Sequence, residues 1–342
     1  MKKLRVLALM NRDLVPPETI EGLTDEQMAA WKMEYDVAVT LGEMGHETLK
    51  LGVADDLAPL RMAIQEFRPH VVFNLLEEFR TQETYVAWVL GYLQLVRQAY
   101  TGCNPTGLLL TSSKALQKRI LRAQRIRVPD FAIFPRDRAV RRPPRLKFPL
   151  IVKSLTQHGS VGIAQASVVH DDERFSERVL FIHQHLGSDA IAEQYIEGRE
   201  LYVGVIGNER LSAYPTWEMT FANLPEGAPR IATERVKWSH RYQTQAGVST
   251  GAAMGLTAEQ EKAISRLCKR TYRALYQTGY ARIDLRMDAE GRIYVIESNP
   301  NPQLAYGEDF AESADAGGVS YEALLQKILT LGMRDGESGS RL

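Results

Sequence analysis

Apolar segments alternate with helix-like segments through the first third of the chain, and this alternation limits the possible folds more than any other feature. We expect strands at residues 4–10, 48–53, 70–75 and 98–100. We expect helices at residues 25–44, 57–67 and 83–96. A capping box of Thr24 and Gln27 would open the first helix, and Gly45 would end it. Strands separated by helices in this order predict an open parallel α/β unit.

After residue 110 the pattern changes to short strands and hairpins. Strands are expected at residues 131–134, 150–154, 162–168, 190–195, 201–206 and 210–215, and helices at 114–124, 172–186 and 258–276. Residues 218–256 read as a long polar loop, followed by a hairpin of residues 279–287 and 292–298. The fold class is therefore α/β, with α+β character in the C-terminal two thirds. The parts are predicted as residues 1–110, 111–189 and 190–335, with a frayed tail at 336–342.

The charge balance and the cysteines exclude several classes of function. The 342 residues contain 42 Lys and Arg against 42 Asp and Glu, so the basic excess typical of nucleic-acid and acidic-membrane binding is absent. Cys103 and Cys268 form no CxxC pair, which disfavours a disulfide framework or a Cys-rich zinc site. The longest apolar stretch, residues 86–96, falls well short of the roughly 20 residues that span a bilayer. We expect a cytoplasmic protein with no nucleic-acid or membrane partner.

The final hairpin carries the most informative polar residues. Side chains alternate along a strand, so Arg282 and Asp284 share one face, as do Glu297 and Asn299. If the turn pairs residue 288 with residue 291, Arg282 faces Glu297, and Asp284 faces Val295 as a diagonal neighbour of Glu297. Diagonal neighbours lie roughly 7–8 Å apart, which is close enough for two carboxylates to share a cation.

Two readings of this hairpin remain open at the level of the residues. Asp284 and Glu297 with the neutral oxygen of Asn299 suit Mg²⁺, which accepts one or two carboxylates plus phosphate oxygens. Alternatively, Arg282 and Glu297 form an ordinary cross-strand salt bridge while Asp284 is exposed.

Two other segments suggest a nucleotide. Lys153 ends an apolar strand and precedes a loop containing Gly159 and Gly162, whose backbone N–H groups could cradle phosphate oxygens. Farther along, Glu193 could accept a hydrogen bond from an adenine amino group and Glu200 one from a ribose hydroxyl. An ordinary glycine-rich hairpin and an ordinary β-turn explain the two segments equally well, and neither the P-loop nor the Rossmann glycine pattern is present.

Taken together, the order and spacing of these three segments resemble the ATP-grasp superfamily, and within it the D-alanine–D-alanine ligases. The resemblance runs from Thr111 to the neighbourhood of Leu331 and, more loosely, from residue 1. It implies an N-terminal α/β domain followed in the sequence by an ATP-grasp fold. It also implies an ATP-dependent carboxylate–amine ligase, which forms an amide or peptide bond through an acyl phosphate and releases ADP and phosphate.

The resemblance also assigns roles to residues. The nucleotide-binding positions would be Lys114 and Lys153 for phosphates, Ser160 and Gly162 in a phosphate-covering loop, Glu193, Tyr195, Ile196 and Glu200 around adenine and ribose, and Lys237 on a second mobile loop. The remaining positions would be the metal ligands Asp284, Glu297 and Asn299, and the catalytic Arg282, which stabilises the tetrahedral intermediate. The expected cofactors are ATP and two Mg²⁺ ions, with Mn²⁺ as an alternative.

The chain departs from this family where the amino-acid substrates would bind. The glycine-rich turn that carries a substrate-binding Glu is replaced by residues 11–17, with Glu34 as a possible substitute. After Asn299 the chain has the sequence Pro-Asn-Pro-Gln303-Leu304, where the dipeptide ligases use Pro-Gly followed by a serine that holds the carboxylate of the second substrate. The expected partners are therefore ATP, a small carboxylate and an amine such as an amino acid or peptide, with a homodimer possible. The alternatives are a true D-alanine–D-alanine ligase and an inactive nucleotide-binding protein.

Overall fold

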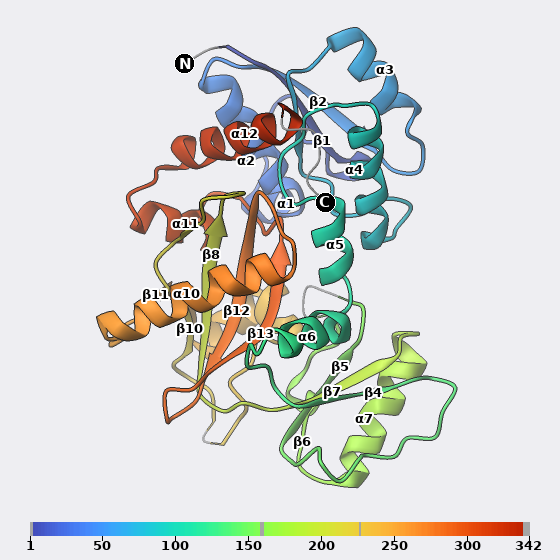
Figure 1. The fold of residues 1–342 in the computed structure, drawn as a ribbon, viewed down its shortest axis with the longest axis vertical. Helices are drawn as coiled ribbons and strands as arrows, with labels where there is room; N and C mark the ends of the chain where they lie inside the picture. The colour runs from blue at the N-terminus through green and yellow to red at the C-terminus, as the bar shows by residue number, and fades with distance from the viewer. Residues whose placement is uncertain (1–2, 158–160, 226, 338–342) are drawn as a thin grey trace.

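The computed structural model describes residues 3–157, 161–225 and 227–337. Within them the chain forms three β-sheets with helices packed against them. Figure 1 shows the N-terminal sheet and its helices at the top, a large sheet with a long helix at the lower left, and a smaller sheet at the lower right. The α/β class and the antiparallel character of the C-terminal part are thus confirmed.

The first sheet is parallel, with the order β2-β1-β3. Its strands are β1 (Arg5–Asn11), β2 (Glu47–Val53) and β3 (Val71–Asn74). The strand expected at residues 98–100 does not form, because only Tyr100 makes a bridge, to Val72. This sheet confirms the open parallel unit predicted from the alternating pattern.

Helices cover both faces of the first sheet, as the nearly continuous burial of the apolar strand β1 requires. Val6, Ala8 and Met10 face α2 (Lys32–Glu43), while Leu7 and Leu9 lie in the core beneath α3 (Ala58–Phe67) and α4 (Val86–Leu95). The last helix, α12 (Tyr321–Glu337), joins α2 on the first face, and the short α11 (Asp309–Ala316) packs beside it. The end of the chain therefore completes the core of its beginning.

The first predicted helix is interrupted. Thr24 and Gln27 form the expected capping box, with Gln27 N donating to Thr24 Oγ1 at 3.3 Å and Thr24 N to Gln27 Oε1 at 2.8 Å. The helix they open, α1 (Asp25–Met28), passes into the 3₁₀ turn Ala29–Trp31 before α2 begins. Trp31 leaves the helical region at φ −124° and ψ 21°, so a single helix over 25–44 was wrong.

The second sheet has four antiparallel strands in the order β4-β7-β5-β6. They are β4 (Phe131–Phe134), β5 (Leu150–Ser154), β6 (Val168–Val169) and β7 (Ala190–Gln194). The strand expected at 162–168 is reduced to β6, because a 3₁₀ turn occupies Gln165–Ser167. The helices of this region are α5 (Pro105–Thr111), α6 (Lys114–Ala123) and α7 (Asp172–His185). Helix α5, which Asn104 caps, was not anticipated.

The third sheet has the order β11-β10-β8-β12-β13, with β9 beside β8. Its strands are β8 (Arg199–Ile206), β9 (Ser212–Ala213), β10 (Trp217–Phe221), β11 (Val248–Ala252), β12 (Tyr280–Met287) and β13 (Ile293–Pro300). Helix α10 (Ala258–Ala274) packs on it. The strand expected at 210–215 is therefore limited to the two residues of β9.

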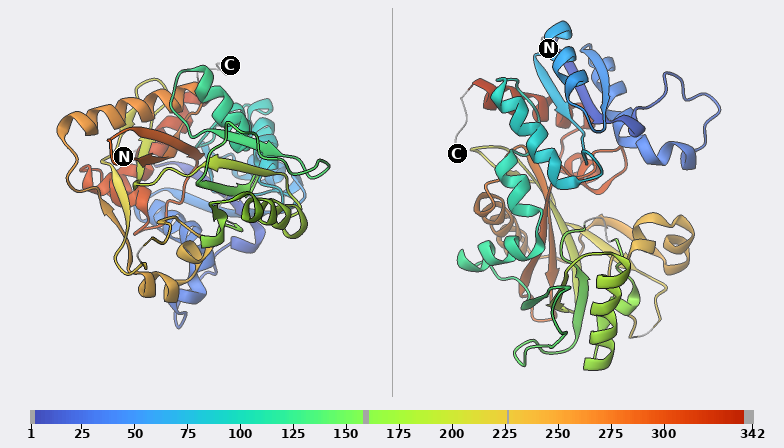
Figure 2. Two further views of the ribbon diagram at one scale, coloured as in Figure 1. Left: turned by 90° about the horizontal axis from the view of Figure 1, so that it is seen from below. Right: turned by 90° about the vertical axis from the view of Figure 1, so that its right-hand side faces the viewer.

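Residues 218–256 are not a loop, contrary to the sequence prediction. They contain most of β10, the helices α8 (Glu234–Trp238) and α9 (His240–Ala246), and β11. Strand β11 lies at the sheet edge with no fully buried side chain, so its composition is polar and resembles that of a loop. Figure 2 shows α8 and α9 on the opposite side of the strands from α5 and α6.

No helix in the described ranges has the length and apolar character that crossing a membrane requires. At the C-terminus, α12 extends through Glu337, so the first two residues of the expected frayed tail are helical. Residues 338–342 lie outside the described ranges.

Candidate active site

A bulge in the last hairpin places its two acidic residues directly opposite each other. Asp284 pairs with Glu297, and Leu285 pairs with Val295, so Ile296 is the extra residue of β13. The predicted register, with Asp284 opposite Val295, was wrong because a turn alone does not reveal an inserted residue. Bulges of this kind redirect side chains beside active sites.

Asp284 is held by two neighbours and is only 9% exposed. The Arg282 guanidinium forms a bidentate ion pair with it, Nε to Oδ1 at 2.7 Å and Nη2 to Oδ2 at 2.9 Å. Asn299 Nδ2 also donates to Asp284 Oδ2, at 2.9 Å. The alternative in which Asp284 is exposed was therefore wrong. Burial opposes the charge of Arg282, but Asp284 outweighs it and raises the pKa of Arg282 above its usual range.

The oxygens of this hairpin fit a magnesium ion. Asp284 and Glu297 lie across from each other, and Asn299 adjoins them on the same strand as Glu297. Within the described ranges, no three His, Cys, Asp or Glu side chains gather as metal ligands. A cation here would thus have two carboxylates and an amide oxygen, and would complete its shell with water or phosphate oxygens, as Mg²⁺ commonly does.

Two lysines lie near the acidic pair, one from helix α6 and one from the second sheet. Lys114 begins α6, and its Nζ donates to Gln157 O and lies 4.0 Å from Glu297 Oε2. Lys153, on β5, donates to Glu193 Oε2 at 3.2 Å. Both lysines line the same cleft as Asp284 and Glu297, and burial lowers the pKa of Lys114. The cleft thus combines two lysine ammonium groups with two carboxylates.

Glu193, expected to contact adenine, is 1% exposed and lies between two lysines. Lys118 Nζ is 3.3 Å from Glu193 Oε1, and Lys153 binds the other oxygen. Burial alone would raise the pKa of Glu193, but the two lysine charges overcome it and lower that pKa. Lys118 was missed, although it follows Lys114 by one helical turn, a spacing that places both on one face. Glu193 therefore orients the lysines as well as bordering the cleft.

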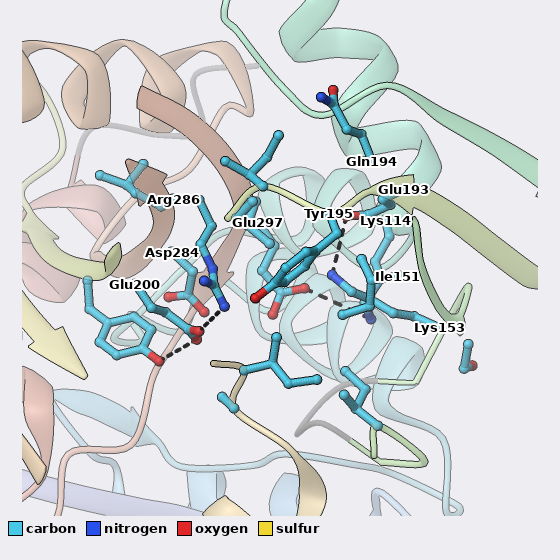
Figure 3. A pocket seen from close by; sticks show the side chains of 18 of the residues that line it. Lys114, Ile151, Lys153, Glu193, Gln194, Tyr195, Glu200, Asp284, Arg286 and Glu297 are labelled. Carbon is cyan, nitrogen blue, oxygen red and sulfur yellow. Dashed lines mark hydrogen bonds and ion pairs between the residues drawn. The ribbon is translucent and has the colours of Figure 1, made fainter. Parts of the chain in front are cut away.

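On the other side of the cleft, an arginine organises the predicted adenine and ribose residues. Figure 3 shows Tyr195 between the Lys114, Lys153 and Glu193 group and the Glu200, Asp284 and Arg286 group. Arg286 Nη2 donates to Glu200 Oε2 at 2.6 Å, and its guanidinium lies 5.6 Å from the Tyr195 ring centroid. Ile196 also lines the cleft. Arg286 was missed, although it continues the alternation of residues 282 and 284 on β12.

We expect Arg286→Met to raise the KM for ATP by about tenfold or more and to change kcat less than threefold. A hydrogen bond to a charged group contributes roughly 1.5–3 kcal/mol, and here the variant also leaves Glu200 without its arginine. Steady-state phosphate release at varied ATP measures both constants. Arg61→Met, an exposed change on α3, is the control. An unchanged KM would remove Arg286 from the nucleotide site.

The two loops expected to cover the phosphates contact each other. Gly162 N donates to Glu234 Oε2 at 2.8 Å, and Glu234 N donates to Ile163 O at 2.9 Å. Gly162 has φ +69°, which explains glycine at this position. Lys237 lies one turn later on α8, but its side chain is outside what the structure describes, as is all of Ser160.

Glu34 is separate from the lining of the cleft. It lies in the first turn of α2 and is 1% exposed. Nine of the predicted site residues line the cleft: Lys114, Lys153, Glu193, Tyr195, Ile196, Glu200, Arg282, Asp284 and Glu297. Asn299 is joined to this group through Asp284.

Comparisons with known proteins agree with this architecture. The family model described as D-ala D-ala ligase C-terminus matches residues 120–330. An uncharacterized protein y4sG of Sinorhizobium fredii is 28% identical over 87% of this chain and 86% of its own length. A D-alanine–D-alanine ligase of Bordetella petrii is 30% identical over 70% of each chain.

A crystal structure of the D-alanine–D-alanine ligase from Bacillus anthracis complexed with ATP superposes with a TM-score of 0.74 and 19% identity. It covers 98% of this chain and 100% of its own. The family match extends over more than half of the sequence and includes the whole hairpin of β12 and β13. The chain therefore belongs to the D-alanine–D-alanine ligase family of ATP-grasp enzymes, which are ATP-dependent carboxylate–amine ligases.

Proposed function

We propose that this ligase joins a small carboxylate to an amine through an acyl phosphate and releases ADP and phosphate. The observation that carries the proposal is the single cleft in which Lys114 and Lys153 face Asp284 and Glu297, with Arg282 beside them. Such a site would place the lysine charges around a polyphosphate and the Arg282 guanidinium, a hydrogen-bond donor, next to that polyphosphate. Phosphoryl transfer depends mainly on this kind of positioning and charge stabilisation.

The nucleotide would lie along the cleft between the second and third sheets. Tyr195 and Ile196 offer an apolar surface for adenine, with Glu193 bordering it, and Glu200, oriented by Arg286, would accept a hydrogen bond from a ribose hydroxyl. Lys114 and Lys153 would bind phosphate oxygens. These assignments support ATP as the nucleotide.

Asp284, Glu297 and Asn299 would hold one or two Mg²⁺ ions, or Mn²⁺ in their place. When bound, the metal would neutralise charge on the transferring phosphoryl group. The carboxylate of the first substrate would attack the γ-phosphorus of ATP, and ADP would leave. The resulting acyl phosphate would then lie beside Arg282.

In the second step the amine would attack the acyl carbon. The C–N bond would form, the bond from carbon to the phosphate oxygen would break, and the proton of the attacking nitrogen would pass to the departing phosphate. Arg282 would stabilise the oxyanion of the tetrahedral intermediate, a contribution of about 2.7–4 kcal/mol for a well-placed donor. Ser160, Gly162 and Lys237 would belong to the loops that exclude water, which matters because acyl phosphates hydrolyse.

Phosphate release with Mg²⁺-ATP, measured against a panel of D- and L-amino acids and dipeptides, tests this function. The expected result is ADP and phosphate in equal amounts, dependent on a carboxylate and an amine. Turnover with D-alanine as sole substrate would assign to this chain the activity for which the Bordetella petrii relative is named. Nucleotide binding without turnover of any substrate would favour an inactive binding protein. That alternative is disfavoured because all three metal-ligand positions, Asp284, Glu297 and Asn299, carry oxygen donors. The homodimer stays a prediction, testable by sedimentation velocity.

A further inference from the structure

Acidic residues gather at the C-terminal edge of the first sheet, where open α/β sheets commonly bind ligands. Strands β1 and β3 run parallel and end side by side, and Leu75 N donates to Leu9 O at 2.8 Å just beyond β3. Glu77 and Glu78 follow at once, and Asn11 Nδ2 at the end of β1 donates to Glu78 Oε1 at 3.3 Å. Two carboxylates therefore stand at this edge.

Glu34 reaches the same edge from the helix side. Helix α2 packs on β1 and β3 through Met33, Val37 and Leu41. It is the helix that connects β1 to β2, so its first turn lies at the C-terminal edge of the sheet. Glu34 is 1% exposed, and its Oε1 has no hydrogen-bond partner within the described part of the chain. Burial raises the pKa of Glu34 to about 7, and the nearby charge of Glu77 adds to this rise. A buried carboxyl oxygen without a donor is costly unless a ligand supplies one.

The acidic edge interacts electrostatically with residues at and near the cleft. Burial raises the pKa of Glu83, in the 3₁₀ turn Glu83–Tyr85, and the charge of Lys114 opposes that rise. Tyr280, two residues before Arg282 on β12, has a pKa raised by burial and by the charge of Glu77. The charges of Glu77 and Glu83 therefore act on Tyr280 of β12 and on Lys114 of the cleft.

We propose that Glu34, Glu77 and Glu78 bind the ammonium groups of the amino-acid substrate and select one whose side chain carries a second ammonium. This inference rests on the proposed ligase function and names its substrate class. One carboxylate is enough for the α-ammonium of a neutral amino acid. A methyl or alkyl side chain would leave the other carboxylates unmatched, whereas a basic side chain would satisfy them through charge-assisted hydrogen bonds.

Matched pairs of amino acids test the selection on the wild-type enzyme. Lysine is compared with norleucine, and ornithine with norvaline, each as both enantiomers, with alanine included and phosphate release as the readout. The expected kcat/KM is at least about tenfold higher for the basic member of one pair, the effect of a charged hydrogen bond. Equal or better turnover of norleucine, norvaline or alanine would overturn the inference while leaving the ligase function intact.

Calorimetry keeps the two proposals separable. Lysine and norleucine are titrated into the protein saturated with Mg²⁺ and a non-hydrolysable ATP analogue. Tighter binding of lysine than of norleucine supports the inference, whether or not an amino acid drives phosphate release. The absence of phosphate release with every amino acid would contradict the ligase function alone. Equal affinity for the two amino acids would contradict the inference alone.

Variants show whether the acidic residues cause the selection. Glu34→Gln and Glu77→Gln should each lower the ratio of basic to neutral kcat/KM at least about fivefold without changing ATP affinity, since each removes one charged contact. Glu66→Gln, an exposed change on α3, should leave the ratio unchanged. A preserved ratio in both site variants would overturn the inference.

Thermal stability separates binding from a structural role for Glu34. With a pKa near 7 in the fold and near 4.5 when unfolded, Glu34 is ionised in both states at pH 8, and burying that charge opposes folding. Glu34→Gln should therefore raise Tm at pH 8, and the gain should shrink toward pH 5, where the folded carboxyl is protonated. A lower Tm at pH 8 would mean that Glu34 stabilises the fold and would contradict the proposed role.

Discussion

Asp284→Asn is expected to lower kcat about a thousandfold while ATP still binds. The change keeps the size of the side chain but removes one of the two carboxylates that face each other across β12 and β13. Metal-ion stabilisation of phosphoryl transfer contributes several kcal/mol, and each 1.36 kcal/mol corresponds to a tenfold change in rate. Phosphate release at saturating ATP and Mg²⁺ measures kcat, and calorimetry with an ATP analogue measures nucleotide binding.

Asp315→Asn provides the matched control, because Asp315 is exposed on α11. Its kcat should equal that of the wild type. The Tm of both variants shows whether a loss of activity reflects unfolding. If Asp284→Asn retains more than a third of the wild-type kcat in a folded protein, the assignment of Asp284 to the metal is wrong.

Arg282→Met should lower kcat by about a hundred- to a thousandfold, the usual effect of removing a donor to a developing oxyanion. The same variant should not need more Mg²⁺. In this structure Arg282 engages both oxygens of Asp284, at 2.7 and 2.9 Å, so a cation must compete with the guanidinium for that carboxylate. Removing the arginine is therefore expected to leave the half-saturating Mg²⁺ concentration unchanged or lower.

Kinetics at varied Mg²⁺ distinguish two roles for Arg282. A lower kcat with an unchanged or reduced Mg²⁺ requirement supports an action on the intermediate. A Mg²⁺ requirement raised tenfold, with kcat restored at saturation, would show that Arg282 only positions Asp284. Arg292→Met, at the exposed turn of the same hairpin, is the control and should match the wild type.

The identity of the hairpin residues could be predicted from the sequence, but their register could not. Alternation placed Arg282 and Asp284 on one face, and the structure keeps them there. The bulge at Ile296 depends on how β13 pairs along its length, which no turn residue encodes. As a result, the true geometry brings Asp284 nearer to Glu297 than the predicted diagonal arrangement.

Other features depended on contacts between elements that are distant in sequence. Glu193 borders the cleft as expected, but its lowered pKa depends in part on Lys118. Lys118 lies on helix α6, far from Glu193 in the sequence. The docking of α12 onto the first sheet joins the two ends of the chain through a hydrophobic core. Local patterns predict strands and helices, whereas such long-range packing decides which polar groups are buried together.

The balanced net charge conceals a local separation of charges. Lys114, Lys118 and Lys153 gather on one side of the cleft, and Asp284 and Glu297 lie across from them. Zero net charge therefore coexists with a site suited to a polyphosphate and its cation. The prediction against a nucleic-acid partner concerned the sum of the charges, and the site depends on their arrangement.

The most direct test of the central claim uses a carboxylate substrate labelled with ¹⁸O in both oxygens. The enzyme is incubated with Mg²⁺-ATP, the labelled acid and an amine, and the products are analysed by mass spectrometry. An acyl-phosphate route transfers one ¹⁸O to inorganic phosphate, leaves the other in the amide and yields ADP. Label in AMP together with released pyrophosphate, or phosphate without ¹⁸O, would contradict the account.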